Sequence, residues 1–497
     1  MEVDKKQNTF AKFLSNSKQY PVLAAIAAGL YPLLFYYTNN YTLINSWGHF
    51  GYFAAVFILA PIVIFLVAYK VSNLFIFKKV QPYVLPFLNI FIFLFLLKVA
   101  IFAGFDVLKS GVVLVTSLLL AFILHKYFKR WIVFQLILAV LGVITLVPKV
   151  ISQLNYSKVW LQQPDDIETA VFKKKPNIYF IQPDGYVNFS ELKKGHYQLE
   201  NAEFESFLKE NNFKTYPNFR SNYASTLTTN SAVFMMKHHY YNKGSNFTEA
   251  VNAREVIISE NSVLKVLKHN GYKTFFISEQ PYFLVNKPKM GYDFSNFSAE
   301  EISFVTTGLD IQKEVMPPLE SFMEEHPVGP NFFFVEIFNP GHIANRDYNS
   351  KGIAGERAHY QESLKEANRM LTLTTNAILE RDPGALIVIM ADHGGFVGMK
   401  AVNESYNKTE DHDLINSIFS TILAIHWPNG KAPDFDVDLK SSVNLFRILT
   451  AYLTEDRGYL ENLQEDGSYI IIYTGAPQGT YQYLDNNGKV IFKRCYE

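Results

Sequence analysis

The sequence predicts a multi-span α-helical membrane domain, followed by an α/β domain with a mostly parallel sheet between helices and a small C-terminal β hairpin region. Nearly all long apolar runs lie before residue 150, and most of the charge comes after it. From residue 176 onward, short β-branched and aromatic runs alternate with helical patterns. We therefore expect a membrane domain at 1–150, a linker at 151–175 and a folded domain at 176–497.

Five runs in the first part are long and apolar enough to form helices that cross a bilayer, which takes about 20 residues each. They cover residues 20–38, 51–69, 84–104, 108–125 and 131–149.

The loops between these runs differ in positive charge, which predicts orientation because Lys and Arg are retained on the inner side. The first loop, 39–50, has no Lys or Arg, and the third has only Lys109. The N-terminus and the second and fourth loops carry the rest: Lys5, Lys6, Lys12, Lys18, Lys70, Lys78, Lys79, Lys126, Lys129 and Arg130. The N-terminus is thus expected inside, and five crossings place the second domain outside.

Composition excludes several classes of protein. The net charge is zero, which gives no reason to expect a nucleic-acid partner. Cys495 is the single cysteine, so a disulfide framework and a Cys-rich zinc site are both excluded.

The second domain reads as strands and helices in alternation, which is typical of a parallel sheet covered on both faces. Five strands are expected within "PNIYFIQPDG", "KTFFISE", "NFFFVEIFNPGH", "GALIVIMADHGG" and "FSTILAIHWPNG". A helix is expected in "NSVLKVLKHNG", ending at Gly271. "TYQYLDNNGKVIFKRC" predicts an antiparallel hairpin around residues 486–488.

Polar side chains follow three of these strands. The first strand ends at Asp184, the third at Asn339 to His342, and the fourth at Asp392 and His393. Because ligands bind beyond the carboxyl ends of strands in open sheets, these residues are expected to share a site. Two carboxylates and one imidazole suit zinc or manganese.

Hydroxyl side chains gather in "SNYASTLTTNSAVFMM", where an apolar run begins. Such hydroxyls cap a helix, or one of them serves as a nucleophile at the positive end of the helix. A hydroxyl that fills the open position of a catalytic metal loses its proton readily. We expect Thr226 to fill this position and its neighbours to cap the helix and bind phosphate oxygens.

The order strand–Asp-Gly, Thr at a helix start, then strand–Asp-His-Gly resembles the alkaline phosphatase/sulfatase superfamily. With several N-terminal spans, the chain is similar to the membrane-bound phosphoethanolamine transferases and lipoteichoic acid synthases. "SNYASTLTT", "NSVLKVLKHNGYKT", "ADHGG" and "SSVNLFRILTAYL" carry this resemblance. It implies an alkaline-phosphatase-like fold.

The resemblance also implies roles for individual residues. Asp184, Asp392 and His393 would be metal ligands, and Thr226 would be both a ligand and the nucleophile. Thr229, three positions on, matches a position of the transferases; a shifted alignment, closer to the synthases, makes Thr229 the nucleophile instead. Residues expected to contact substrate are Asn339, His342 and, more weakly matched, His412, for which a solvated surface position is the alternative.

Departures from the family narrow the chemistry. The chain lacks the Cys/Ser-x-Pro-x-Arg motif of true sulfatases, which argues against sulfate-ester hydrolysis. The acid before the Gly-His of "NPGH" is Glu336 rather than an Asp, so one metal ion is expected rather than two. The disulfides of phosphoethanolamine transferases are also absent.

The expected function is transfer of a phospho-alcohol head group, of phosphoethanolamine or phosphoglycerol type, from a membrane lipid to a glycan or lipid acceptor through a phospho-threonine. A hydrolase with the same site and an inactive scaffold that binds glycans or proteins remain alternatives. The expected location is the bacterial inner (cytoplasmic) membrane, with the catalytic domain on the periplasmic side.

Overall fold

The computed structural model describes residues 9–40, 46–102, 106–243 and 249–495. The chain divides into two compact units: a membrane unit, with residues up to Asn155 and Ser303–Thr307, and a catalytic unit formed by Tyr156–Ile302 and Gly308–Glu497. The fold class predicted from the sequence, a helical membrane domain followed by an α/β domain, is confirmed.

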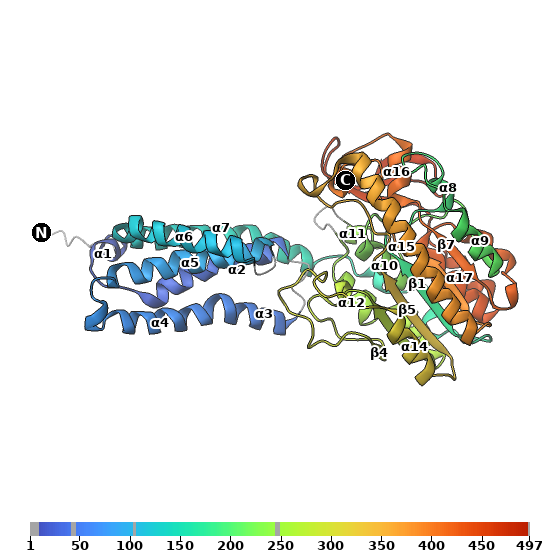
Figure 1. Cartoon of the computed structure of the whole chain (residues 1–497), viewed down its shortest axis with the longest axis horizontal. Coiled ribbons are helices and arrows are strands. Elements are labelled where there is room, and N and C mark those ends of the chain that lie inside the picture. The colour runs from blue at the N-terminus through green and yellow to red at the C-terminus, as the bar shows by residue number, and fades with distance from the viewer. Residues whose placement is uncertain (1–8, 41–45, 103–105, 244–248, 496–497) are drawn as a thin grey trace, which may run out of the picture. The chain divides into compact units, whose positions relative to one another are not determined.

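The membrane unit is built from helices (Figure 1). Among the described residues, four helical segments are long and apolar enough to cross a membrane: Pro21–Asn39, Trp47–Ser72, Gln81–Phe102 and Val107–Leu154. The helices of this unit are α1 (Thr9–Ser15), α2 (Pro21–Asn39), α3 (Trp47–Ala54), α4 (Ala60–Ser72), α5 (Gln81–Phe102), α6 (Val107–Leu124) and α7 (Phe128–Leu154).

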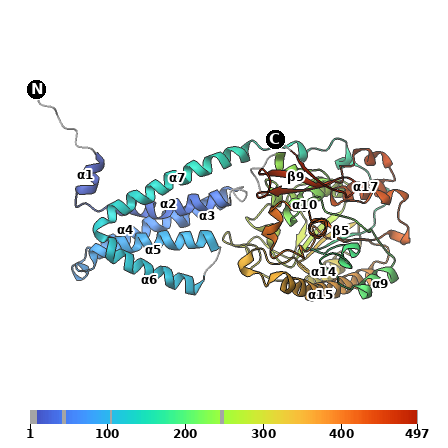
Figure 2. The ribbon, with the colours of Figure 1, turned by 90° about the horizontal axis from the view of Figure 1, so that it is seen from above.

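The last of the four segments, 48 residues long, exceeds twice the length of one crossing. A 3₁₀ turn at His125–Tyr127 divides it into α6, with 18 residues, and α7, with 27. Figure 2 shows α6 and α7 as separate rods that diverge from this turn. Each rod alone has about the length that a bilayer requires.

The catalytic unit contains a seven-stranded sheet in the order β2-β7-β6-β1-β5-β3-β4. β1 pairs in parallel with β5 and β6, and β3 pairs in parallel with β4 and β5, whereas β7 is antiparallel to both neighbours. The strands are β1 (Ile178–Pro183), β2 (Phe213–Thr215), β3 (Lys273–Ser278), β4 (Phe294–Ser295), β5 (Asn331–Ile337), β6 (Leu386–Met390) and β7 (Leu423–His426).

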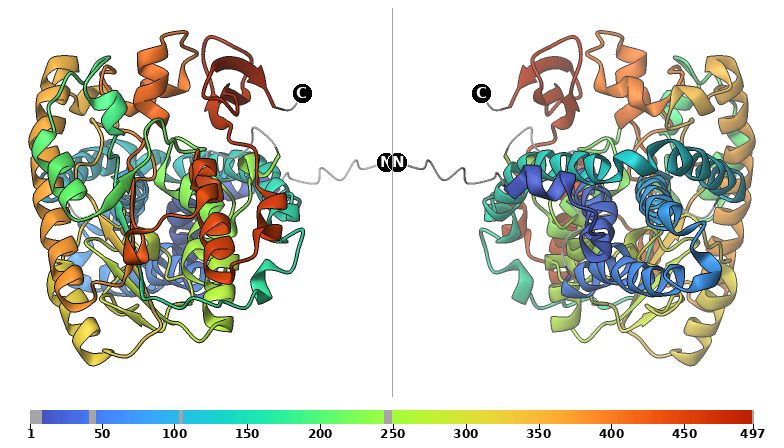
Figure 3. Two further views of the ribbon diagram at one scale, coloured as in Figure 1. Left: turned by 90° about the vertical axis from the view of Figure 1, so that its right-hand side faces the viewer. Right: turned by 90° about the vertical axis from the view of Figure 1, so that its left-hand side faces the viewer.

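Helices cover both faces of this sheet, and side chains alternate between two cores along each strand. Phe180 and Phe334 pack with one group of helices, whereas Ile181 and Val335 pack with the other. Figure 3 shows the long helix α15 on one side and α17 on the other. The first group is α10 (Thr226–Met235), α12 (Ala253–Ile258), α13 (Ser262–His269) and α17 (Leu445–Thr454); the second is α9 (Ala202–Glu210), α14 (Met316–Glu325), α15 (Gly352–Arg381) and α16 (His412–Phe419).

The helix expected before Gly271 is α13, and local residues explain its limits. Asn261 accepts a hydrogen bond from the Leu264 N–H at 2.8 Å and so caps the start. Gly271, just beyond the end, has a φ of +81°, which a residue with a side chain rarely adopts.

The region after residue 465 forms a second sheet, in the order β10-β9-β8. β9 (Gly479–Leu484) and β10 (Val490–Arg494) are the expected antiparallel hairpin. β8 (Ser468–Ile472) completes the sheet and was not expected from the sequence.

Residues that follow α7 pack on the catalytic unit. Trp160, Ile167 and Phe172 are buried in the same core as α10, α13 and α17. Asp165 forms an ion pair with the fully buried Arg447, at 2.5 Å. Much of the expected linker is therefore part of the catalytic unit's core.

Candidate active site

Three potential metal ligands come together at the carboxyl ends of two neighbouring strands. Asp184 follows β1, and Asp392 and His393 follow β6. One ligand atom from each residue lies within 4.8 Å of the others, and all three side chains are buried. The parallel pairing of β1 with β6 brings these residues together.

Thr226 reaches this group from the first position of α10. Its Oγ1 lies 3.4 Å from His393 Nε2. The same nitrogen is 3.4 Å from Asp184 Oδ1 and 3.4 Å from Asp392 Oδ2. Ligands placed tetrahedrally around zinc at 2.0–2.2 Å lie roughly 3.3–3.6 Å from one another. These spacings therefore fit four ligands of one divalent metal.

The two carboxylate oxygens nearest to His393 Nε2 are Asp184 Oδ1 and Asp392 Oδ2. Both are buried and lack a hydrogen-bond partner among the described residues. The other oxygen of Asp392 accepts hydrogen bonds from the backbone N–H groups of His393 and Gly185, at 3.0 and 3.2 Å. His393 Nδ1 donates to the Gly394 carbonyl at 2.9 Å, so that Nε2 presents a lone pair. The donor set fits zinc or manganese.

The electrostatics of the group also favour a bound cation. Burial, followed by the charge of Asp392, raises the pKa of Asp184. Burial lowers the pKa of His393, but Asp392 and Asp184 outweigh this effect and the net pKa is raised. Two carboxylates that repel each other in a buried place are stabilised when a cation binds between them.

Two backbone hydrogen bonds clasp the loop after β1 to the loop after β5. Asp184 N–H donates to the Ile337 carbonyl at 2.8 Å, and Gly341 N–H donates to the Asp184 carbonyl at 2.9 Å. Gly185 has a φ of +65°, and a Cβ added there would lie 2.2 Å from the Gly341 oxygen. Only glycine permits this close approach.

These two hydrogen bonds bring His342 beside the candidate metal ligands Asp184, Asp392 and His393. The rings of His342 and His393 have centroids 5.7 Å apart. His342 Nδ1 donates to the Ile343 carbonyl at 2.7 Å, which leaves Nε2 for another partner. Burial lowers the pKa of His342, with a further contribution from His393, so the neutral imidazole is favoured.

The hydroxyls that surround Thr226 have backbone partners. Thr229 Oγ1 donates to the Tyr223 carbonyl at 3.0 Å, and Thr228 Oγ1 donates to the Ser225 carbonyl at 2.9 Å. Ser231 Oγ donates to the Thr228 carbonyl at 3.1 Å. Thr226 is half-buried, whereas Thr228, Thr229 and Ser231 are fully buried.

The other two expected substrate residues are Asn339 and His412. Asn339 is half-buried, with its Nδ2 3.9 Å from Met370 Sδ. His412 is the exposed first residue of α16. Among the described contacts, none joins either residue to Asp184, Asp392 or His393.

Several residues that support the site gave little signal in the sequence. The Tyr360 hydroxyl donates to the Gly185 carbonyl at 2.9 Å and accepts from the Val187 N–H at 3.1 Å, which fixes the loop after β1. The Tyr197 hydroxyl accepts from the Gly395 N–H at 2.9 Å and so holds the loop after β6. Only the position of these tyrosines in three dimensions reveals the role.

Glu336 and Gln182 pair across β5 and β1, and both are fully buried. Glu336 Oε2 accepts from Ser278 Oγ at 2.8 Å, whereas Oε1 has no hydrogen-bond partner among the described residues. Burial raises the pKa of Glu336 well above its usual value. A Glu inside the apolar run "NFFFVEIF" was the one available signal for a polar position beneath the site.

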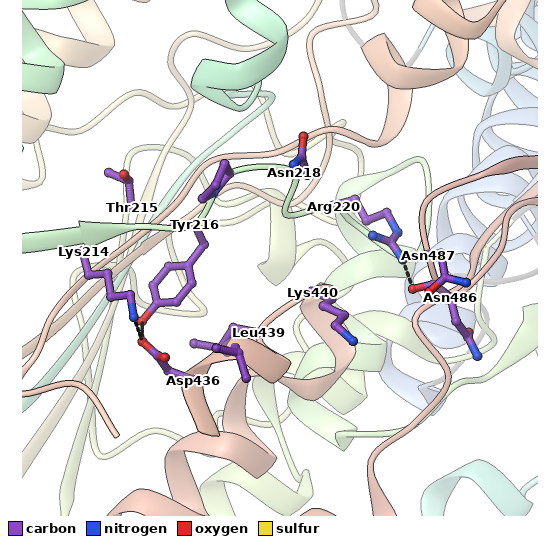
Figure 4. Close-up of a pocket in the computed structure, with 12 residues that line it drawn as sticks. Lys214, Thr215, Tyr216, Asn218, Arg220, Asp436, Leu439, Lys440, Asn486 and Asn487 are labelled. Carbon is purple, nitrogen blue, oxygen red and sulfur yellow. Dashed lines mark hydrogen bonds and ion pairs between the residues drawn. The ribbon is translucent and has the colours of Figure 1, made fainter. Parts of the chain in front are cut away.

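A cavity of about 430 Å³ beside β2 is distinct from this group, because none of the four candidate ligands lines it. Figure 4 shows Lys214 joined to Asp436 and Arg220 joined to Asn486. Lys214 Nζ lies 2.5 Å from Asp436 Oδ2, and Arg220 donates to the carbonyls of Asp485 and Asn486.

Comparison with known proteins assigns the chain to a family. The sulfatase family model matches residues 197–450, more than half of the chain. The chain belongs to the sulfatase family and is an enzyme of the alkaline phosphatase/sulfatase superfamily. No curated protein matches the sequence.

Solved structures similar to the chain include a periplasmic domain and an integral membrane protein, from two bacteria. The C-terminal periplasmic domain of EcEptC from Escherichia coli is 13% identical, with a TM-score of 0.44 over 62% of this chain and 93% of that one. Its complex with Zn is 12% identical, with a TM-score of 0.45 over 63% and 93%. The integral membrane protein lipooligosaccharide phosphoethanolamine transferase A from Neisseria meningitidis is 10% identical, with a TM-score of 0.42 over 87% and 95%.

Proposed function

We propose that the chain transfers a phospho-alcohol head group, of phosphoethanolamine or phosphoglycerol type, from a membrane phospholipid to a hydroxyl of a glycan or lipid. The observation that carries this proposal is the 3.4 Å spacing of Thr226 Oγ1, Asp184 Oδ1 and Asp392 Oδ2 from His393 Nε2. This spacing supports the proposal because a half-buried hydroxyl at a helix start lies beside three candidate metal ligands.

Asp184, Thr226, Asp392 and His393 would hold one zinc or manganese ion. When bound, such an ion lowers the pKa of a coordinated hydroxyl and neutralises charge that develops on phosphoryl oxygens.

In the first half of the reaction, Thr226 Oγ1 attacks the phosphorus of the donor lipid. The P–O bond to diacylglycerol breaks, and the leaving oxygen takes up one proton, which balances the proton lost by Thr226. The N–H groups in the first turn of α10 have no acceptor within the helix, and the helix dipole favours negative charge there. His342 Nε2 is free to contact the phosphoryl or leaving oxygen. The acceptor hydroxyl then displaces Thr226 in the same way.

The membrane unit suits a lipid donor. With α6 and α7 counted separately, five crossings and the Lys and Arg distribution support an N-terminus inside and a catalytic unit outside. We place the protein in the bacterial inner membrane, with its site on the periplasmic side.

The test is intact and peptide mass spectrometry of the full chain purified from membranes, with metal analysis of the same sample. We expect about one metal ion per chain and a phospho-alcohol adduct on Thr226, whose mass identifies the head group. Thr226→Ala should lack the adduct, and Thr229→Ser, which keeps the hydroxyl, is the matched control.

Other outcomes contradict the proposal in distinct ways. An adduct on Thr229 would keep the chemistry and reassign the nucleophile. Bound metal without any adduct, even after phospholipid is added, would favour hydrolysis. The absence of both metal and adduct would favour a scaffold that binds glycans or proteins.

A further inference from the structure

A cavity of about 360 Å³ lies within the membrane unit, at the end where three of its long helices begin. It is lined by residues of the α1–α2 connection, the start of α5 and the turn between α6 and α7. These segments are distant in sequence, and their convergence gives the unit a recess at one end of the helices.

The cavity is strongly basic. Lys18, Lys126, Lys129 and Arg130 line it, and no Asp or Glu does. Asp106 is the only acidic residue that the structure describes in 9–155, and it caps the start of α6 rather than the turn after it. The positive charges of the cavity therefore have no carboxylate partner in the described part of this unit.

Lys129 connects two of the segments that line the cavity. The Lys129 ammonium donates three hydrogen bonds, to the carbonyls of Phe13 and Asn16 and to Asn16 Oδ1, at 2.9, 2.5 and 2.6 Å. All three N–H groups of Lys129 are thus used, and they hold the chain between α1 and α2 against the start of α7.

The other three cations keep their N–H groups available. Lys18 Nζ lies 5.5 Å from the ring centre of Tyr20, and the Arg130 guanidinium lies 5.4 Å from that of Tyr127. Contacts with ring faces hold a cation without using a hydrogen-bond acceptor. Lys18, Lys126 and Arg130 are exposed and, among the described residues, their side chains have no hydrogen-bond acceptor or ion-pair partner.

Helix ends add to this positive potential. α2 begins at Pro21, α5 at Gln81 and α7 at Phe128, and residues in or next to each first turn line the cavity. Each helix N-terminus carries roughly half a positive charge. The recess therefore combines the positive ends of three helix dipoles with several cations, which favours a bound anion.

The position of the cavity identifies the anion. It opens at the end of membrane-crossing helices, beside the exposed ring of Tyr127, and such amphipathic rings lie at the lipid head-group level. Basic pockets between transmembrane helices bind anionic head groups at that depth. We propose that this cavity binds the phosphate of an anionic phospholipid, such as phosphatidylglycerol or cardiolipin, as a resident lipid separate from the catalytic site.

Native mass spectrometry of the full chain, released from nanodiscs that contain equal amounts of phosphatidylglycerol and phosphatidylethanolamine, tests this proposal. We expect one phosphatidylglycerol retained per chain, and at least a tenfold loss of this species in the triple variant Lys18→Gln/Lys126→Gln/Arg130→Gln. The control Lys12→Gln/Lys70→Gln/Lys79→Gln removes the same charge outside the cavity and should retain the lipid.

Equal loss in the two variants would overturn the proposal, because it would indicate general surface attraction. Equal retention of the two lipids by the natural chain would also overturn it, and this measurement needs no variant. Displacement of the lipid by millimolar inorganic phosphate would show that the site takes any phosphate anion rather than a lipid. The thermal unfolding midpoint of each variant identifies a loss that results from misfolding.

Discussion

The candidate active site and the cavity beside β2 are two polar regions of the same catalytic unit. They differ in whether their buried carboxylates are paired within the chain. At the active site, Asp184 and Asp392 are buried together, and the described residues leave one oxygen of each without a hydrogen-bond partner. Beside β2, the buried Asp436 is paired with Lys214 and accepts a hydrogen bond from Tyr216.

This difference in charge pairing favours the candidate active site, rather than the cavity beside β2, as the place where a charged ligand binds. A buried charge that the chain itself neutralises is a structural element, whereas a buried charge left uncompensated is completed from outside. The following experiments test the comparison, from the largest expected effect to the smallest.

Replacing the hydroxyl that faces the metal group should have the largest effect. We expect Thr226→Ala to lower the release of diacylglycerol from phospholipid vesicles by at least ~10³-fold, because removal of a nucleophile leaves only binding and electrostatic contributions. Thr229→Ser should retain most activity, since its hydroxyl still reaches the Tyr223 carbonyl. Loss of activity in Thr229→Ser with activity kept in Thr226→Ala would reverse the assignment.

Neutralising Asp392, one of the two buried carboxylates, should weaken metal binding and stabilise the metal-free protein. We expect Asp392→Asn to weaken zinc or manganese binding by ~100-fold or more, because a neutral amide is a poorer ligand. In the presence of a chelator, the same variant should unfold at a higher temperature than the natural chain, because the repulsion with Asp184 is gone. Thermal scans with chelator and with added metal measure both effects. An unchanged response to metal would remove Asp392 from the ligand set.

His239 offers a third case, a buried group whose partners suit only its neutral form. Its Nδ1 accepts from the Tyr241 N–H at 2.8 Å, its Nε2 donates to the Thr228 carbonyl at 2.9 Å, and burial lowers its pKa from 6.5 to about 3. Below pH 6.5 the unfolded chain binds this proton and the folded chain does not.

The free energy of unfolding should therefore fall as pH decreases from 6.5 towards 3, by up to about 1.4 kcal/mol per pH unit from this residue. Urea unfolding of the full chain at pH 8, 6 and 5 measures the slope. His239→Gln should have a shallower slope than the natural chain, and the exposed His412→Asn serves as the control. Equal slopes in all three proteins would contradict the expectation.

The smallest effect on activity is expected beside β2. Lys214→Met leaves the buried Asp436 with the Tyr216 hydroxyl as its remaining partner, so it should lower the free energy of unfolding by about 1–3 kcal/mol. Activity and metal content should stay unchanged, as in Lys440→Met, which alters the same cavity. A tenfold loss of activity would show that this cavity takes part in the reaction and that the comparison fails.

The long elements were predictable from the sequence because each carries a strong local signal. β1, β3, β5, β6 and β7 lie within the five expected runs, and the hairpin of β9 and β10 turns at its Asn-Gly signal. β2 and β4, with three and two residues, are too short to show any period. β8 was missed because a strand at that position depends on β9, its partner in the second sheet.

Some residues of the candidate site were likewise predictable from the sequence, whereas others were not. Polar residues directly after buried strands are visible in the sequence, and the topology brings Asp184, Asp392 and His393 together. Tyr360 and Tyr197 are ordinary residues in their own segments, and only packing gives them a role. The paired charges beside β2 were equally invisible, because Lys214 and Asp436 are far apart in the sequence.

The clasp between the loops after β1 and β5 makes the positions of Asp184 and His342 interdependent. The two loops share backbone hydrogen bonds, and a Cβ at position 185 would lie 2.2 Å from the Gly341 oxygen. A change that displaces one loop therefore displaces the other, so the candidate metal ligand and the histidine beside it move as one unit.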